Sequence, residues 1–211
     1  VTGHLFTDKE YSDFVLRLEY KLTPGGNNGV GIRAPLDGGG RFSFVGMEVQ
    51  LLDDTSPKYA AIKPWQQCGS VYGLGGAKSG SLKPVGEWNE MEITAIGRRI
   101  KVRNNGKLIT DVDLNTIRDT ALLVQHPGLL RTKGHVGFLG HHDRVEFRNI
   151  RIKEMPHYFE RDNVAPEGFT ALFNGKNLDG WKGLVADPIK RAKMSPEELK
   201  AAQVKADELM R

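Results

Sequence analysis

Ile100-Lys-Val-Arg-Asn-Asn-Gly-Lys-Leu-Ile-Thr110 reads as two short strands joined by Asn105-Gly106, and this is the clearest fold signal in the sequence. An Asn-Gly pair favours the two-residue type I′ turn, in which both central residues take positive φ and the flanking strands pair antiparallel. The segments Ile100–Arg103 and Lys107–Thr110 are therefore predicted to form a β-hairpin.

The rest of the first 155 residues repeats this pattern of short strands and polar turns. Apolar and polar residues alternate over Tyr11–Lys21, as on a strand with one buried face. Further strands are predicted over Val30–Arg33, Phe44–Leu52, Ser70–Leu74, Glu87–Ile96, Gly134–Leu139 and Val145–Lys153. Regular short strands without a long helix are typical of an all-β fold, here an antiparallel β-sandwich.

Charge and apolar content limit the kinds of partner that the chain is expected to bind. The 211 residues carry a formal charge of only +4, and the densest basic runs, 98–103 and 148–153, alternate with apolar residues as on a solvated strand. We therefore expect no nucleic-acid partner. No apolar run approaches the ~20 residues of a membrane span, so no membrane partner is expected either. Cys68 is the single cysteine, which rules out a disulfide within the chain.

The character of the chain changes after residue 155. A polar, proline-bounded stretch over 156–167 is predicted to be a linker between a first domain, 1–155, and a second segment, 168–211. In the second segment a strand is predicted over Phe169–Phe173. Ser195-Pro-Glu-Glu198 has the form of a capping box, with Ser195 as N-cap, Pro at the first helical position and Glu three residues after the cap. A C-terminal helix is therefore predicted over Leu199–Met210.

Polar residues on the predicted strands suggest a binding face. Alternation in Met47–Leu51 places Glu48 and Gln50 together on one side, and Arg33 is expected on the same outer face. An ordinary solvated sheet face would explain this pattern. However, Glu, Gln and Arg near Tyr72 and Trp88 form the mixture that hydrogen-bonds and stacks on sugars. The segment His141-His142-Asp143 is either a metal or general-base site or a polar turn.

Seven segments of the first domain, taken in order, resemble the 3-keto-disaccharide hydrolase domain family, which has a concanavalin A-like (lectin/glucanase jelly-roll) sandwich fold. These segments are Leu5–Glu19, Asn27–Arg33, Gly46–Asp53, Gly69–Gly73, Pro84–Asn89, Gly137–His141 and Val145–Ile152. The stretch Gly168–Trp181 resembles the opening segment of such a domain. The resemblance therefore implies a fragment of a tandem-domain protein, with a C-terminal helical tail in this chain.

The resemblance implies a periplasmic or secreted bacterial enzyme that cleaves glycosides already oxidised to a ketone at C3. The ketone acidifies the C2 proton, so a base can remove it, the glycosidic oxygen leaves by β-elimination, and water then adds to the enone. A small-molecule carbohydrate would be the partner. A divalent metal ion is an expected cofactor of many relatives, with ligands that this sequence does not define.

On the matching positions, Glu48 is expected as base or metal ligand and His141 as its acid–base partner or ligand. Arg33 would stabilise the enolate or hold hydroxyls. The substrate-binding residues expected are Gln50, Tyr72, Asp53 and Trp88. His142 makes it ambiguous which histidine faces the site, and Cys68 stands where a polar residue or His is expected.

Two other interpretations stay open at this point. A non-catalytic carbohydrate-binding module would use the same fold, with Trp88, Tyr72 and Arg33 for stacking and hydrogen bonding. In the second interpretation the chain is a structural half of a larger enzyme, in which the strand within 168–181 would cover an open edge of the sandwich by domain swapping or a tandem-domain contact.

Overall fold

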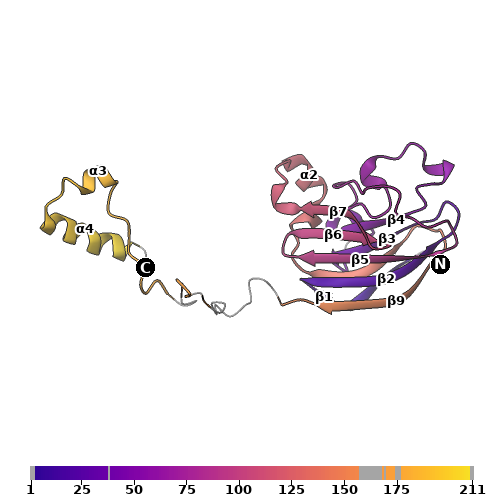
Figure 1. Cartoon of the computed structure of the whole chain (residues 1–211), viewed down its shortest axis with the longest axis horizontal. Helices are drawn as coiled ribbons and strands as arrows, with labels where there is room; N and C mark the ends of the chain where they lie inside the picture. Colours follow the sequence, from indigo (N-terminus) through magenta and orange to yellow (C-terminus); the bar gives the residue numbers. More distant parts are fainter. Residues whose placement is uncertain (1–2, 38, 157–167, 169, 174–176, 210–211) are drawn as a thin grey trace. The chain divides into compact units, whose positions relative to one another are not determined.

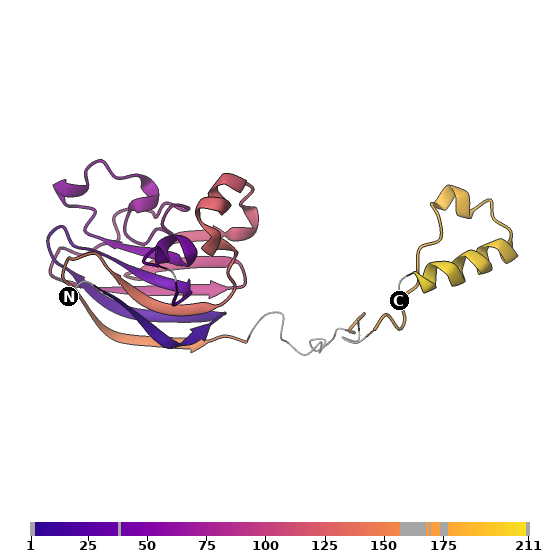
Figure 2. The same ribbon diagram turned by 180° about the vertical axis from the view of Figure 1, so that it is seen from behind.

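The computed structural model describes residues 3–37, 39–156, 168, 170–173 and 177–209. The chain divides into two compact units, residues 1–159 and residues 160–211. The first unit is built around two antiparallel sheets (Figures 1 and 2). This confirms the predicted all-β antiparallel sandwich.

The two sheets have four and five strands. The four-stranded sheet has the order β1 (His4–Tyr11), β8 (Gly134–Gly140), β3 (Asn27–Ala34), β4 (Met47–Leu52). The five-stranded sheet has the order β7 (Lys107–Asp113), β6 (Arg99–Asn104), β5 (Trp88–Ile96), β2 (Phe14–Leu22), β9 (Val145–Glu154).

The hairpin at Asn105-Gly106 forms as predicted. Asn104 pairs with Lys107, and the two residues between them have φ values of 47° and 78°. These are the positive angles that a type I′ turn requires. The turn fixes the register of β6 and β7 at one end of the five-stranded sheet.

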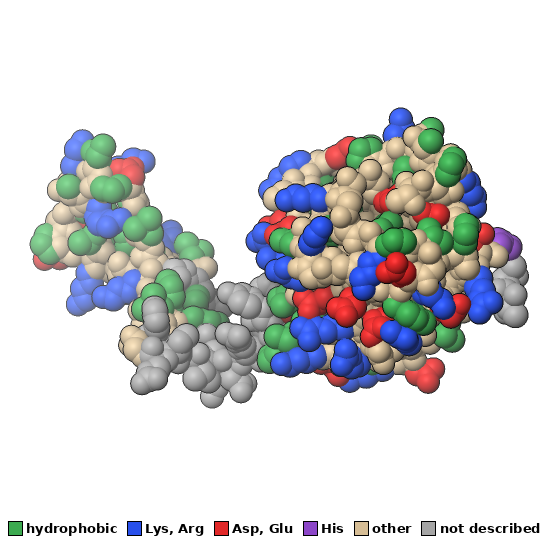
Figure 3. Space-filling model, turned by 45° about the vertical axis from the view of Figure 1, so that its right-hand side comes forward, with side chains coloured by type: hydrophobic (Ala, Val, Ile, Leu, Met, Phe, Trp, Pro, Cys, Tyr) green, Lys and Arg blue, Asp and Glu red, His purple; other side chains and the backbone are tan. Residues whose placement is uncertain are grey.

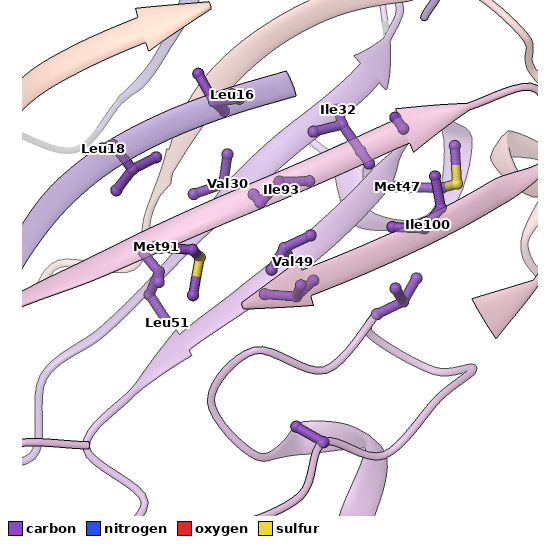
Figure 4. Packing of buried hydrophobic residues seen from close by; sticks show 14 of the residues in the cluster. Leu16, Leu18, Val30, Ile32, Met47, Val49, Leu51, Met91, Ile93 and Ile100 are labelled. Carbon is purple, nitrogen blue, oxygen red and sulfur yellow. The ribbon is translucent and has the colours of Figure 1, made fainter. Parts of the chain in front are cut away.

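The core lies between the sheets, where the inward side chains of both meet (Figure 4). Residues Leu16 and Leu18 of β2 and Ile93 of β5 face residues Val30 of β3 and Val49 of β4, and each is at most 2% exposed. Burying a side chain of this size contributes roughly 1.5–3 kcal/mol. The residues of β2 that face this core are the apolar ones, which explains the alternation seen in the sequence.

Several elements differ from the sequence-based expectation. Strand β1 was not predicted, and the segment before β4 forms a helical turn, α1 (Phe42–Val45), rather than the start of the strand. Within Ser70–Leu74 only isolated bridges form, through Val71. The other short helical elements of the first unit are η1 (Pro57–Tyr59), η2 (Pro64–Gln66), η3 (Leu114–Thr116), α2 (Thr120–Gln125) and η4 (Pro127–Leu130).

The second unit contains two helices, α3 (Pro188–Arg191) and α4 (Pro196–Glu208), among its described residues. The predicted capping box at the start of α4 is present: Ser195 Oγ accepts from the Glu198 backbone N–H, and the Glu198 carboxylate accepts from the Ser195 N–H. Residues 170–173 take no strand conformation, so the prediction of a strand over Phe169–Phe173 is wrong for these described residues. They pair with no other described strand, and an isolated strand leaves its backbone groups unsatisfied.

Apart from Pro156, the linker predicted over 156–167 lies outside the described residues, as does Phe169. None of the described helices has the length and apolar character that crossing a bilayer requires. On the face of the sandwich seen in Figure 3, basic and acidic side chains are interspersed rather than gathered by sign.

A candidate active site on the four-stranded sheet

A polar cleft of about 330 Å³ lies at the β3–β4 side of the four-stranded sheet. Its walls combine carboxylate, amide and imidazole groups with aromatic rings, the mixture of groups that hold and orient small polar ligands. The lining residues are Asn27, Ser43, Phe44, Glu48, Gln50, Leu52, Tyr59, Ile62, Gln66, Tyr72 and His141.

Strand pairing explains why residues distant in sequence meet here. Glu48 and Gln50 alternate along β4, opposite Gly31 and Gly29 of β3. The free side of β4 is covered by residues 69–72, where the Tyr72 N–H donates to the Glu48 carbonyl at 2.9 Å. Of the seven residues expected at the site, Glu48, Gln50, Tyr72 and His141 are therefore brought together.

Glu48 and His141 form the central pair of the cleft. His141 follows β8 directly, and its Nε2 lies 3.4 Å from Oε1 of Glu48. The Glu48 side chain is 3% exposed, whereas His141 keeps access to solvent. Contact with Glu48 raises the pKa of His141 above its ordinary value, against the opposing effect of burial. His142 is exposed and has a φ of 71°, so His141 is the histidine that faces the cleft.

Three buried oxygen atoms of the cleft accept no hydrogen bond of good geometry within the described part of the protein, although one of them, Glu48 Oε1, lies 3.4 Å from His141 Nε2. They are Asn27 Oδ1, Glu48 Oε1 and Gln50 Oε1. A buried acceptor left unpaired costs about 1–3 kcal/mol, so such atoms are normally satisfied by a ligand or by water. All three are acceptors, and a ligand rich in hydroxyl donors matches them.

Aromatic side chains from helical turns and loops complete the cleft. Phe44 stacks on His126 at 4.7 Å, and Tyr72 meets Trp65 edge-on at 5.1 Å. Tyr59 is anchored by its hydroxyl, which donates to the Gly25 carbonyl at 3.1 Å. Except for Tyr72, these residues were missed in the sequence, because they lie on helical turns and loops where no alternation marks a face.

Arg33 does not lie on the polar face with Glu48, and that expectation is wrong. Its side chain is 0% exposed, with Nη2 3.5 Å from Asp13 and donating to the Ser12 carbonyl at 2.9 Å. A further bond runs from Nη1 to the Arg131 carbonyl. Burial lowers the Arg33 pKa to about 10, opposed by the Asp13 charge.

The reason is local. The pairing of β3 with β8 shifts register between Gly31 and Ala34, and Arg33 itself has a φ of 50°. This irregularity breaks the alternation on which the expectation relied. It turns the guanidinium toward carbonyl groups of the protein rather than toward the cleft.

Two other expected residues also lie outside the cleft lining. Trp88 belongs to β5 of the other sheet, where Arg148 and Lys21 lie over its ring at 4.0 and 4.9 Å. The Asp53 carboxylate accepts from the Gly25 N–H and the Thr55 hydroxyl, so it holds a turn beside the cleft.

Cys68 is a core residue. It is 5% exposed and contacts the Tyr20 hydroxyl at 3.5 Å, and burial raises its pKa to about 11.

The donor set gives little support for a metal site. No group of three or more His, Cys, Asp or Glu is arranged to hold a metal ion within the described part of the chain. Glu48 and His141 are the only donors of these types among the cleft residues. A metal held here would need the amide oxygens of Asn27 and Gln50 or water, and we assign no chemical step to one.

The fold and cleft define a class: a β-sandwich domain with a carboxylate–imidazole pair in a cleft suited to a hydroxyl-rich ligand. The chain belongs to the family of 3-keto-alpha-glucoside-1,2-lyase-like domains, whose pattern matches residues 1–153. This confirms the family resemblance found in the sequence.

Two relatives support the assignment. A 3-keto-disaccharide hydrolase of Bacteroides thetaiotaomicron (strain VPI-5482) is 29% identical over 178 residues, 72% of this chain; the match spans only 61% of that relative's length. The crystal structure of a candidate glycosyl hydrolase from Parabacteroides distasonis ATCC 8503 superposes with a TM-score of 0.66. It is 32% identical, over 74% of this chain and 84% of that protein.

A second candidate glycosyl hydrolase of Parabacteroides distasonis has a TM-score of 0.63 at 22% identity, over 72% of this chain and 76% of that protein. At this identity the likeness supports the fold alone.

Proposed function

We propose that the sandwich unit cleaves 3-keto-glycosides by elimination followed by hydration. Glu48 takes the proton from C2, and the electrons of that C–H bond move into an enolate with the C3 ketone. The enolate then expels the glycosidic oxygen from C1, which leaves a C1=C2 double bond conjugated to the ketone. Water adds across this bond, its oxygen at C1 and a proton at C2. The sum is hydrolysis of the glycosidic bond.

The observation that carries this proposal is the buried Glu48 carboxylate, whose Oε1 accepts no hydrogen bond of good geometry and lies 3.4 Å from His141 Nε2. A carboxylate oxygen without a close hydrogen bond keeps a lone pair available for a proton, and at 2% exposure water competes little for the Glu48 carboxylate. A positioned general base contributes roughly 10²–10⁴-fold to a rate.

His141 is placed to complement this base. Its raised pKa keeps a larger fraction of the ring protonated near neutral pH, and Nε2 lies 3.4 Å from Glu48. The imidazolium can donate to the departing glycosidic oxygen, which then leaves as an alcohol. Gln50 and Asn27 would accept hydrogen bonds from the sugar hydroxyls, and Tyr72 would pack against the ring.

The family and relatives make a periplasmic or secreted location part of the proposal, together with origin in a tandem-domain protein. Both follow from resemblance rather than from the cleft. A signal-sequence search in the complete gene and fractionation of the native host would test them.

The test of function uses a chromogenic 3-keto-glucoside and its parent glucoside, each with and without EDTA. We expect release from the keto compound alone, and a loss of about 10²–10⁴-fold in Glu48→Gln. Glu90→Gln, an exposed carboxylate on the five-stranded sheet, is the matched control and should retain activity. Binding of both sugars without turnover would refute the enzyme and support a non-catalytic carbohydrate-binding module. Inhibition by EDTA would add a metal to the site.

A further inference from the structure

Glycine is disfavoured inside a strand, where it marks places that another group approaches closely. Strand β3 carries two glycines on the face toward the cleft, Gly29 and Gly31, and neither has positive φ. The backbone at these positions would therefore accept alanine. What differs between them is the space above each Cα.

The Glu48 side chain lies directly over Gly29. A Cβ added at Gly29 would come within 2.5 Å of Glu48 Cδ and 2.6 Å of Cγ, and closer still to Oε1. Real Cβ atoms are essentially never found at such distances, so the whole carboxylate would have to move.

The space above Gly31 is filled differently. A Cβ there would meet the Leu139 side chain at 3.3 and 3.5 Å and Phe6 at 3.5 Å, contacts that a small adjustment relieves. Gly31 is thus a matched control: it has the same residue type, strand and face, two positions along.

We propose that Gly29 is a positioning residue for the reaction, because its missing side chain is what lets the Glu48 carboxylate lie flat on β3 and face His141. The inference rests on the proposed function for its catalytic consequence, but the geometry itself can be tested without substrate. With the space above Gly29 filled, the carboxylate must swing off the strand, away from its position 3.4 Å from His141 Nε2.

The first test is a double-mutant cycle on unfolding. Gly29→Ala is expected to lower the denaturation midpoint in the native background, where it collides with Glu48. In a Glu48→Ala background the same substitution should leave the midpoint unchanged or raise it, since alanine is better than glycine in a strand. Equal destabilisation in both backgrounds would overturn the proposal. This test also works if Gly29→Ala alone folds poorly, because the second background removes the collision.

The second test follows the His141 ring by NMR titration in the whole chain. In Gly29→Ala the His141 pKa should fall from its raised value toward the ordinary range, as it should in Glu48→Gln, while Gly31→Ala leaves it raised. A His141 titration in Gly29→Ala identical to that of the native chain would overturn the proposal.

Turnover supplies the third readout. A displacement of about 1 Å in a reacting group can cost 10²-fold, so kcat on the 3-keto-glucoside should fall by about 10²-fold in Gly29→Ala and only a few-fold in Gly31→Ala. Equal losses in the two variants would contradict the positioning role. If the native chain shows no turnover, the proposed function fails, and the unfolding cycle and the titration still decide the role of Gly29.

Discussion

Replacing Arg33 by methionine distinguishes a structural role from a catalytic one. The Arg33 side chain is 0% exposed, and Nη2 lies 3.5 Å from the Asp13 carboxylate, which is itself 2% exposed. At that distance the attraction is about 5 kcal/mol for an effective dielectric constant near 20. Breaking a buried pair by removing one partner typically costs about 3–5 kcal/mol. The Ser12 and Arg131 carbonyls lose their donor as well.

Urea unfolding measures this effect. We expect Arg33→Met to lose about 3–5 kcal/mol, which at a slope of about 2 kcal/mol per M lowers the midpoint by roughly 1.5–2.5 M. Arg17→Met is the control: its bond to Glu92 is shorter, 2.7 Å, but the Arg17 side chain is 64% exposed, so the expected cost is at most about 1 kcal/mol. A loss below about 1 kcal/mol in Arg33→Met, with kcat abolished, would refute the structural role and restore the catalytic one.

Three further outcomes follow from the structure. The Asp143 charge contributes to the raised His141 pKa, so Asp143→Asn should lower that pKa. Since protonated His141 is the active acid, the alkaline limb of the kcat/KM profile should then move to lower pH; an unmoved limb would exclude His141 as this acid. The Cys68 thiol, buried and with a pKa of about 11, should react with a thiol reagent only under denaturing conditions, and fast labelling of the folded chain would contradict its burial. Gly106→Val at a φ of 78° should cost about 1–2 kcal/mol in urea unfolding, and a neutral result would argue against the type I′ turn.

Local sequence signals predicted the parts of the fold that local physics controls. The Asn105-Gly106 turn and the Ser195 capping box depend on neighbouring residues, and both formed as predicted. Strand β1 was not predicted, because its residues are exposed or half-buried without a two-residue period, as is common at a sheet edge. Phe44 and Val45, the second half of α1, were predicted as the start of a strand because a short apolar run does not distinguish a helical turn from a strand.

The site was predictable only in part, for a different reason. Period-two alternation placed Glu48 and Gln50 together correctly, because β4 is regular. It could not reveal the register shift that buries Arg33, nor which of the two sheets Trp88 would join. Those outcomes depend on long-range pairing, which no local pattern encodes.

Glu48 is proposed to remove the proton at C2, and hydrogen exchange at that carbon reports on this step. A 3-keto-glucoside deuterated at C2 would be incubated with the native chain and with Glu48→Gln, and the deuterium content of the substrate and product followed by NMR. The native chain is expected to lose the C2 deuterium to solvent, with slower release than from the protonated sugar, and Glu48→Gln is expected to retain it. Release of the leaving group with the C2 deuterium fully kept in the product would contradict the elimination mechanism.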